Sequence, residues 1–317
     1  SFPLRKMFKN QKNFRFRLAE VLSIDSKNKM VHTSVADYDY DYLVIATGAT
    51  SNFFGNKQVE KYALPMKNII EALNICSYLL QNLEEAVLRK NASDRERYLN
   101  FVVVGGGPTG VELSGAIAEY QQHMLKKDYP ELSTYEMKVF LVEGTGKILG
   151  ALSEKSSRDA ERYLHELGVK TILNTVVTDY DGNTVTLSSG EKIPTKTVIW
   201  GAGVMGQMPE GINPEIIQRG NRIKTNEQCI VNGEEVVYAI GDVSAMISEE
   251  NPRGLPGVAP VAQQQGKYVA KHILNKLNNQ ETENFKYFDK GSMATVGRNR
   301  AVVDMGSLHL KGFIAWM

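Results

Sequence analysis

Cysteine is scarce in this sequence, charges of the two signs nearly cancel, and long apolar runs are missing. Cys76 and Cys229 lie far apart and form no CxxC pattern, which argues against a disulfide scaffold, a metal site or a dithiol redox centre and fits a reducing compartment. The formal net charge of +1 gives no electrostatic footprint for nucleic acid. No stretch reaches the roughly 20 apolar residues of a membrane-spanning helix, so we expect a soluble chain.

The composition is that of a globular chain, with 317 residues and 42% hydrophobic residues, enough for about two domains. Apolar or alternating runs predict strands at 16–25, 29–42, 43–48, 100–107, 137–144 and 234–242. Helical periodicity predicts helices at 68–89, 110–127, 153–169 and 257–277. β-Branched residues and two turn signals predict a β-meander within 175–203. The alternation of strands and helices predicts an α/β fold.

A glycine-rich turn, GGGPTG, joins the predicted strand at 100–107 to the following helix. This is the context that the GxGxxG dinucleotide fingerprint requires. Gly105 permits the tight turn, Gly107 lets the backbone approach a pyrophosphate, and Gly110 lets helix and strand lie close together. Unpaired N–H groups and the positive end of the helix dipole favour an anion there. The turn therefore predicts a nucleotide site, which would also include Gly106, Pro108 and Thr109 between the fingerprint glycines. The alternative is a simple tight turn with no ligand.

Glu143, at the end of the next strand, is the predicted acidic partner of this turn. A carboxylate there accepts hydrogen bonds from ribose hydroxyls and repels a 2′-phosphate, which favours NAD(H) over NADP(H). Glu143 lies 33 residues beyond Gly110, where about 20 is usual. Residues 126–136 are therefore interpreted as an insertion between helix and strand. The alternative is that Glu143 is only a solvated acidic strand end.

Five short blocks occur in order between residues 41 and 242: DYLVIATG, VVVGGGPTGVELSG, LVEG, TVIWGAGV and VYAIGD. Because these blocks occur in this order, the chain resembles the two-dinucleotide-domain flavoprotein oxidoreductases, specifically the type II NADH:quinone oxidoreductases. The resemblance implies an FAD/NAD(P)-binding two-domain fold in which a Rossmann-like NAD domain is inserted in a partial FAD domain. The implied boundaries are 1–64 and 204–280 for the FAD domain, 65–203 for the NAD(H) domain, and 281–317 for the start of a membrane-associating region.

The resemblance also implies the activity, cofactors and partners. A respiratory, non-proton-pumping NADH dehydrogenase would transfer a hydride from NADH to FAD and then two electrons to a membrane quinone. The implied partners are quinone and a membrane surface, without nucleic acid, and a homodimer is left open. The implied location is peripheral, at the cytoplasmic face of the inner (plasma) membrane. The basic stretch 2–17 and the apolar stretch 306–317 fit that location, although a solvated face and a segment docked on the core are the plainer readings.

Several cofactor-binding residues follow from the resemblance. Asp242 after Gly241 would hydrogen-bond the flavin ribityl chain, with an ordinary capping role as the alternative. Glu112 would lie near the nicotinamide and flavin, although an acid in a first helical turn also complements the dipole. The remaining residues implied to contact FAD or the nicotinamide are Ala46, Thr47, Gly48, Gly203 and Val204.

The segment APVAQQQG (259–266) resembles the family helix that approaches the flavin and borders the quinone. Ala259, Pro260 and Val261 would line the flavin at the helix N-terminus, which stabilises an anionic reduced ring. Gln264 matches the second family glutamine, whereas Pro260 stands where many relatives have the first. The alternative is a polar helix face.

No second glycine fingerprint is present, although the family has one that holds the ADP half of FAD. We therefore expect a fragment that lacks the first βαβ unit and a C-terminal membrane-attaching tail, and weak FAD retention by it. Two other functions are kept: a module that binds NADH without flavin, and a flavoprotein of the ferredoxin reductase or apoptosis-inducing-factor type with a soluble electron acceptor.

Overall fold

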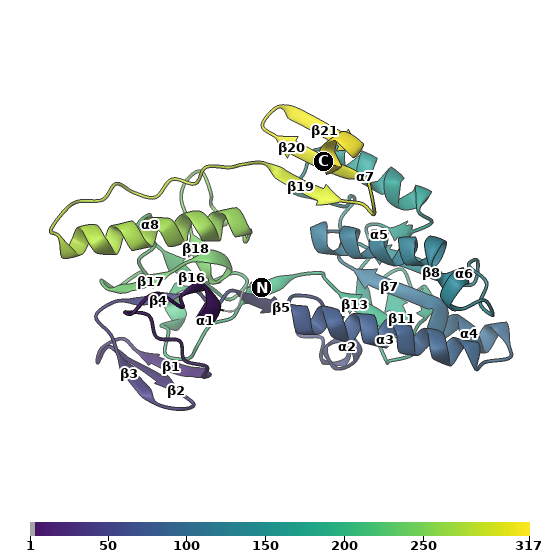
Figure 1. Cartoon of the computed structure of the whole chain (residues 1–317), viewed down its shortest axis with the longest axis horizontal. Coiled ribbons are helices and arrows are strands. Elements are labelled where there is room, and N and C mark those ends of the chain that lie inside the picture. Colours follow the sequence, from purple (N-terminus) through teal and green to yellow (C-terminus); the bar gives the residue numbers. More distant parts are fainter. Residues whose placement is uncertain (1–3) are drawn as a thin grey trace. The chain divides into compact units, whose positions relative to one another are not determined.

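The computed structural model describes residues 4–317 (Figure 1), so residues 2 and 3 of the basic stretch 2–17 lie outside the described residues. The chain forms two compact units. Unit 1 contains the residues up to 49 and residues 205–287; unit 2 contains residues 50–204 and 288–317. The chain first passes from unit 1 to unit 2 after residue 49, about 15 residues before the expected domain boundary at 64/65. The last 30 residues, 288–317, belong to unit 2.

Unit 2 is built on a five-stranded parallel sheet with the order β6-β13-β7-β8-β9. β7 (Asn100–Val104) lies at its centre and all five of its residues are buried. Its side chains alternate: Phe101 and Val103 belong to one hydrophobic core and Val102 and Val104 to the other. The period of two places one core on each face of the sheet. The other strands are β6 (Leu64–Pro65), β8 (Lys138–Val142), β9 (Lys170–Ile172) and β13 (Thr197–Trp200).

Three helices supply the first of these cores: α3 (Ile69–Val87), α5 (Pro108–His123) and α7 (Glu154–Glu166). α3 begins with a capping box, in which the Asn68 side chain accepts from the Glu71 N–H and the Glu71 side chain accepts from the Asn68 N–H. Ser153 caps α7 as expected. α5 begins two residues before the predicted start because proline is well suited to the first turn of a helix.

The other core lies under an antiparallel sheet, β10-β11-β12, which is the predicted meander. Its strands are β10 (Val177–Tyr180), β11 (Thr184–Leu187) and β12 (Lys192–Pro194). The short helix α2 (Lys57–Tyr62) contributes Val59 to this core, whereas α4 (Ala92–Leu99) and α6 (Leu125–Asp128) contribute Leu99 and Leu125 to the first core. The expected insertion at 126–136 holds most of α6 and the loop after it.

The last residues form a small antiparallel sheet, β19 (Ser292–Thr295), β20 (Ala301–Met305) and β21 (Leu308–Gly312), followed by α9 (Phe313–Trp316). This sheet contacts α5 and α7. A Cβ on Gly115 of α5 would lie 2.8 Å from the Gly297 nitrogen, so a glycine is needed for this close approach. The small sheet therefore packs on α5 and α7, whereas within the stretch 306–317 Ala315 is buried and Leu308, Phe313, Ile314, Trp316 and Met317 are exposed.

Unit 1 contains short sheets and one long helix, α8 (Ala259–Leu277). β4 (Leu43–Ile45) pairs in parallel with β17 (Val237–Ala239). The expected strand 29–42 is two strands, because a turn separates β2 (Met30–Thr33) from β3 (Asp37–Asp39). The remaining elements are α1 (Leu4–Met7), β1 (Val21–Asp25), β5 (Ala49–Ser51), β14 (Val204–Gly206), η1 (Pro214–Ile216), β15 (Ile217–Gln218), β16 (Arg222–Thr225), η2 (Gly241–Val243) and β18 (Ser244–Met246). Within residues 4–317 no helix combines the length and apolarity needed to span a membrane.

Candidate functional site

The glycine turn of unit 2 connects the buried end of β7 to the first turn of α5. Gly105 has φ +107°, and a Cβ there would lie 2.7 Å from the backbone of Ala202. A Cβ on Gly110 would lie 1.8 Å from the Gly105 carbonyl oxygen. Both positions therefore admit glycine alone, since any larger residue would displace backbone. The first and last fingerprint glycines have the packing roles expected of them.

Gly107 plays a different part. It is the N-cap of α5, with ordinary φ −72°, and no side chain caps this helix end. A Cβ on Gly107 would meet no atom within 4 Å, and Pro108 and Thr109 beside it are exposed. The space over the helix N-terminus is open, and the unpaired N–H groups of the first turn have no side-chain acceptor. These features fit a pyrophosphate of a dinucleotide.

Glu143 lies at this turn in spite of its distance in sequence. The Gly106 N–H donates to Glu143 Oε2 over 2.6 Å. The Thr145 N–H and hydroxyl donate to Glu143 Oε1 over 2.7 and 2.8 Å. The carboxyl ends of the parallel strands β7 and β8 meet at one edge of the sheet, which is why the insertion before β8 does not move Glu143 away.

Three further predicted residues lie in unit 2. Glu112 is exposed on α5 but lies beyond its first turn, contrary to expectation, because the helix begins at Pro108; its Oε1 accepts from the Thr295 N–H over 3.3 Å. Gly203 has φ +151°, and a Cβ there would lie 2.7 Å from the Phe54 ring. Val204 is half exposed. Glu112 thus already has a structural partner in the C-terminal sheet.

A second group of predicted residues lies in unit 1, where β4 and β17 end side by side. The Ile240 N–H donates to the Ile45 carbonyl over 3.0 Å, which brings the segment Ala46-Thr47-Gly48 next to Gly241-Asp242. η2, which contains Gly241 and Asp242, contacts α8. Val258 caps α8 without a side-chain hydrogen bond. Pro260 has no N–H and the Val261 N–H donates to the Val258 carbonyl over 3.1 Å, so this helix end offers an anion mainly the positive end of the helix dipole. The structure therefore brings the flavin-type residues of this unit together.

Two residues of unit 1 were missed by sequence reasoning. Gln265 is buried, and its Oε1 accepts from the Gly241 N–H over 2.7 Å, whereas its neighbour Gln264 is half-buried. Arg222 donates to the carbonyls of Ser244 and Leu255. Burial lowers the pKa of the Arg222 guanidinium, and the nearby Asp242 carboxylate opposes that shift. The QQQ run contains Gln265 but does not indicate which glutamine is buried, and no local signal marks Arg222.

Comparison with known proteins decides the family. Residues 3–266 match the model of the pyridine nucleotide-disulphide oxidoreductase family. The chain is 34% identical to the type II NADH:quinone oxidoreductase Ndh of Mycobacterium tuberculosis, over 99% of this chain and 70% of that protein. It is 33% identical to the type II NADH:quinone oxidoreductase of Staphylococcus haemolyticus, over 95% of this chain and 74% of that protein. The chain belongs to the type II NADH:quinone oxidoreductase family.

Solved structures confirm the two-dinucleotide-domain fold of this family member. The structure of NDH2 from Plasmodium falciparum in complex with NADH matches with a TM-score of 0.84 at 22% identity, covering 94% of this chain and 78% of that chain. The sulfide:quinone oxidoreductase of Aquifex aeolicus matches with a TM-score of 0.71 at 18% identity, covering 94% of this chain and 71% of that chain. At sequence identities of 22% and 18%, these structural matches show that the fold is shared and nothing more.

The cysteines of this type II oxidoreductase offer no disulfide chemistry of the kind in the broader family's description. Cys76 is exposed on α3 of unit 2, and Cys229 is buried in unit 1; both are free. Burial raises the pKa of the Cys229 thiol to about 12, so the thiolate nucleophile is suppressed.

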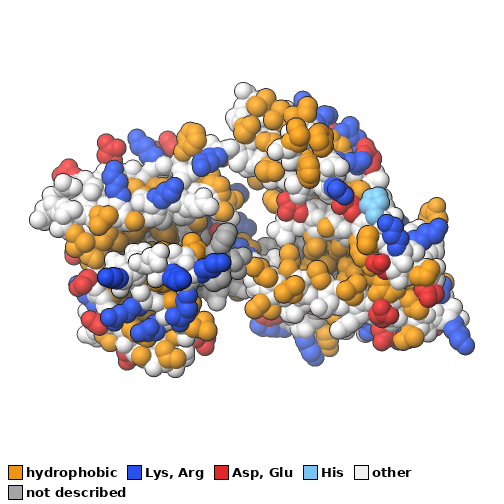
Figure 2. Space-filling view, in the orientation of Figure 1, with side chains coloured by type: hydrophobic (Ala, Val, Ile, Leu, Met, Phe, Trp, Pro, Cys, Tyr) orange, Lys and Arg blue, Asp and Glu red, His pale blue; other side chains and the backbone are white. Residues whose placement is uncertain are grey.

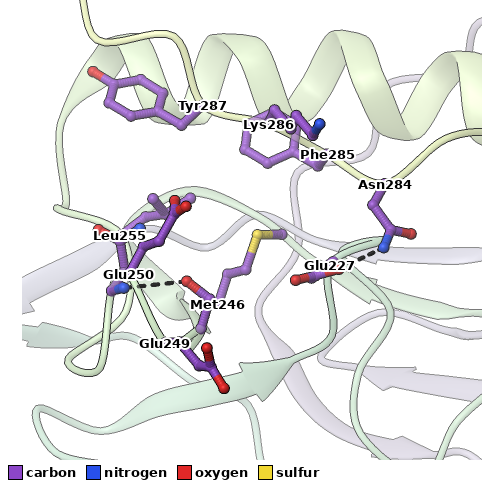
Figure 3. Close-up of a pocket in the computed structure, with 11 residues that line it drawn as sticks. Glu227, Met246, Glu249, Glu250, Leu255, Asn284, Phe285, Lys286 and Tyr287 are labelled. Atoms are coloured by element: carbon purple, nitrogen blue, oxygen red, sulfur yellow. Dashed lines mark hydrogen bonds between the residues drawn. The ribbon is translucent and has the colours of Figure 1, made fainter.

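A cavity of about 860 Å³ in unit 1 has none of the predicted site residues in its lining (Figure 3). Met246, Leu255 and Phe285 give it apolar walls, and Glu227 and Glu249 are among its acidic lining residues. The Asn284 amide donates to the Glu227 carboxylate. Val261 of α8 nevertheless belongs to the hydrophobic core that contains the lining residues Met246, Leu255 and Phe285.

Proposed function

We propose that this chain is an NADH:quinone oxidoreductase that binds NADH at the glycine turn of unit 2 and FAD at the strand ends of unit 1. Its family membership supports the reaction. The observation that carries the nucleotide assignment is the meeting of three features at one sheet edge: the open N-cap Gly107, the unpaired start of α5 and the Glu143 carboxylate.

The residues of unit 2 would bind and orient NADH. The N-terminus of α5 would hold the pyrophosphate through backbone N–H groups and its dipole. Glu143 would accept from the adenosine ribose and disfavour a 2′-phosphate. The cation close by in sequence, Lys147, forms an ion pair of 2.9 Å with Glu154, so it is not placed as a counter-ion for a phosphate on the ribose. Gly203, Val204 and Glu112 are proposed to border the nicotinamide.

The residues of unit 1 would hold FAD and tune it. When bound, FAD supplies a two-electron relay between NADH and quinone. Asp242 would accept from the ribityl hydroxyls, and Ala46, Thr47 and Gly48 would lie against the cofactor through their backbone. The uncapped N-terminus of α8 at Ala259–Val261 would favour negative charge on the reduced ring. Gln265 would keep Gly241 in place for this task.

Quinone and a membrane surface are the proposed partners. Gln264 would border the quinone, as the family pattern implies. Hydrophobic side chains gather over β20, β21 and α9 in Figure 2, and the exposed ones at the C-terminal end are Met305, Leu308, Phe313, Ile314, Trp316 and Met317. Such an exposed apolar patch fits peripheral attachment to the surface of a membrane.

The test is NADH oxidation by the purified chain after incubation with FAD and desalting, with a water-soluble quinone as acceptor. Because FAD retention is expected to be weak, we expect only part of the added flavin to absorb in the visible range after desalting, together with quinone-dependent consumption of NADH. NADH binding without flavin absorption would instead support the binding module. Turnover with a soluble protein acceptor but not with quinone would support the ferredoxin reductase type.

A further inference from the structure

The Glu143 carboxylate is held by the protein from two sides. Gly106 donates its N–H to Oε2 at 2.6 Å, and Thr145 donates both its N–H and its hydroxyl to Oε1, at 2.7 and 2.8 Å. A carboxylate offers about four lone-pair positions. Three are used here, so the carboxylate is fixed in orientation and still has capacity for one more donor.

A glycine is needed at position 106 because the Glu143 side chain lies so close, and not because of the backbone conformation there. Its φ is ordinary, unlike that of Gly105. A Cβ on Gly106 would lie 3.0 Å from Glu143 Cγ and Oε2, tighter than normal contacts allow. The Gly106 carbonyl also accepts from the Leu149 N–H over 2.6 Å, which fixes this peptide from its other side. The middle glycine of the turn therefore lets the carboxylate reach the N–H.

The Thr145 hydroxyl has one proton and two acceptors within reach. Glu143 Oε1 lies at 2.8 Å and the Lys147 carbonyl oxygen at 3.0 Å. A hydrogen bond to an ionised acceptor is stronger than one to a carbonyl, so the proton favours Glu143. Thr145 is exposed, so burial in a core does not require its side chain.

We propose that Thr145 is a positioning residue for NADH, holding Glu143 so that its one remaining acceptor position serves a ribose hydroxyl. The same fixed negative charge would reject a 2′-phosphate, because a carboxylate that cannot turn away keeps its charge at the ribose. Thr145 would thus set the preference for NADH over NADPH through Glu143. This inference rests on the proposed NADH site of unit 2.

The test is binding of NADH and NADPH to the full chain by isothermal titration calorimetry, which needs neither flavin nor turnover. Thr145→Val removes the hydroxyl but keeps the shape and the backbone N–H. We expect the NADH dissociation constant to rise about five-fold, the size of one typical intramolecular hydrogen bond, with NADPH affinity unchanged or higher. Thr145→Ser should restore the wild-type ratio of the two affinities.

Thr178→Val is the matched control in the same unit. The Thr178 hydroxyl donates to the Thr186 carbonyl over 3.1 Å on β10, and this variant should keep the wild-type ratio. If Thr145→Val leaves the ratio of NADH to NADPH affinity unchanged, whether both affinities stay the same or both fall equally, the inference is overturned while the proposed NADH site stands. A wild-type chain that binds neither nucleotide overturns both the inference and the proposed NADH site.

Discussion

Gln265 Oε1 accepts the Gly241 N–H over 2.7 Å, so a buried side chain of α8 fixes the turn that follows β17. Asp242, the proposed ribityl contact, is the next residue of this turn. An amide of α8 thereby couples the helix to the strand end at which the flavin is proposed to bind. The relationship makes Gln265 a structural support for the flavin site.

Gln265→Ala should therefore destabilise unit 1. The substitution leaves the Gly241 N–H without its acceptor and opens a small cavity, which costs roughly 1–3 kcal/mol of unfolding free energy. Urea denaturation followed by circular dichroism measures this change. Gln263→Ala, an exposed position on the same helix, is the control and should have little effect. Equal stability of the two variants would show that the Gln265 bond is not important.

Gly107→Ala should weaken NADH binding without harming the fold. The new methyl group meets no protein atom within 4 Å, and φ −72° suits alanine, but the methyl would occupy the space proposed for the pyrophosphate. We expect at least a ten-fold loss of NADH affinity by calorimetry, about 1.4 kcal/mol. Gly150→Ala, also with nothing within 4 Å, is the matched control. Wild-type affinity in Gly107→Ala would remove the glycine turn as the phosphate site.

Gly110→Ala should behave differently from Gly107→Ala, although both alter the same turn. Its Cβ would lie 1.8 Å from the Gly105 carbonyl oxygen, so helix and turn must separate. The expected result is a lower melting temperature, measured by differential scanning calorimetry, with NADH binding lost as a consequence. A Gly110→Ala chain as stable as the wild type would contradict the close contact between α5 and the turn.

Glu112→Gln separates a catalytic role from a structural one. The glutamine carbonyl can still accept from the Thr295 N–H, so we expect unchanged stability. If Glu112 acts electrostatically near the nicotinamide, NADH:quinone turnover should fall about ten-fold, or about 1.4 kcal/mol in barrier, with little change in NADH affinity. Stopped-flow measurement of NADH oxidation and calorimetric titration provide the two readouts.

Glu119→Gln is the control for Glu112→Gln. Glu119 lies two turns later on α5 and accepts from the Arg298 N–H of the same C-terminal sheet. It should lose neither stability nor turnover. Equal turnover in both variants would show that Glu112 has no catalytic role and only contacts the Thr295 N–H.

Asp304 should make unit 2 sensitive to acid. Burial by itself would raise the pKa of Asp304, but hydrogen bonds from Ser153, Ser156 and His309 outweigh it and lower the pKa to about 2. A carboxyl whose pKa is depressed on folding contributes stability above its unfolded pKa of about 3.9 and loses it as the pH falls through the folded value. The contribution is roughly 2 kcal/mol, present at neutral pH and lost between about pH 4 and pH 2.

Asp304→Asn tests this acid sensitivity. The variant should be less stable at pH 7, and its unfolding free energy should change less than that of the wild type between about pH 5 and pH 2. Urea denaturation at each pH gives the comparison. Asp179→Asn, at an exposed position on β10, should retain the wild-type pH profile. Parallel profiles for Asp304→Asn and the wild type would contradict the depressed pKa.

Much of unit 2 could be predicted from local patterns. α3 was expected at 68–89 and is observed at 69–87, because its apolar spacing and the Asn68 capping residue both act within a few residues of each other. The glycine turn was predictable for the same reason. The position of Glu143 needed one general rule besides, that the carboxyl ends of adjacent parallel strands share an edge.

The supporting contacts were not predictable in this way. Gln265 and Gln264 are adjacent in one polar run, and only the direction in which α8 presents each side chain makes Gln265 the partner of Gly241. Arg222 lies 20 residues before Asp242 and carries no motif. The turn that divides 29–42 into two strands was missed because the alternation of residues continues through it.

Local physical chemistry in the sequence was thus sufficient for the α/β fold, the glycine turn and the acidic strand end, whereas the family followed from the resemblance of five motifs in order. These features depend on residues a few positions apart, whose periodicity and backbone preferences act without the rest of the chain. Tertiary structure was needed to show that the C-terminal sheet docks on α5 and α7, that Gln265 holds Gly241, and that Thr145 and Gly106 hold Glu143. Such contacts depend on how separate elements pack, because a hydrogen bond between distant segments exists only once the fold has brought donor and acceptor within 3 Å or so.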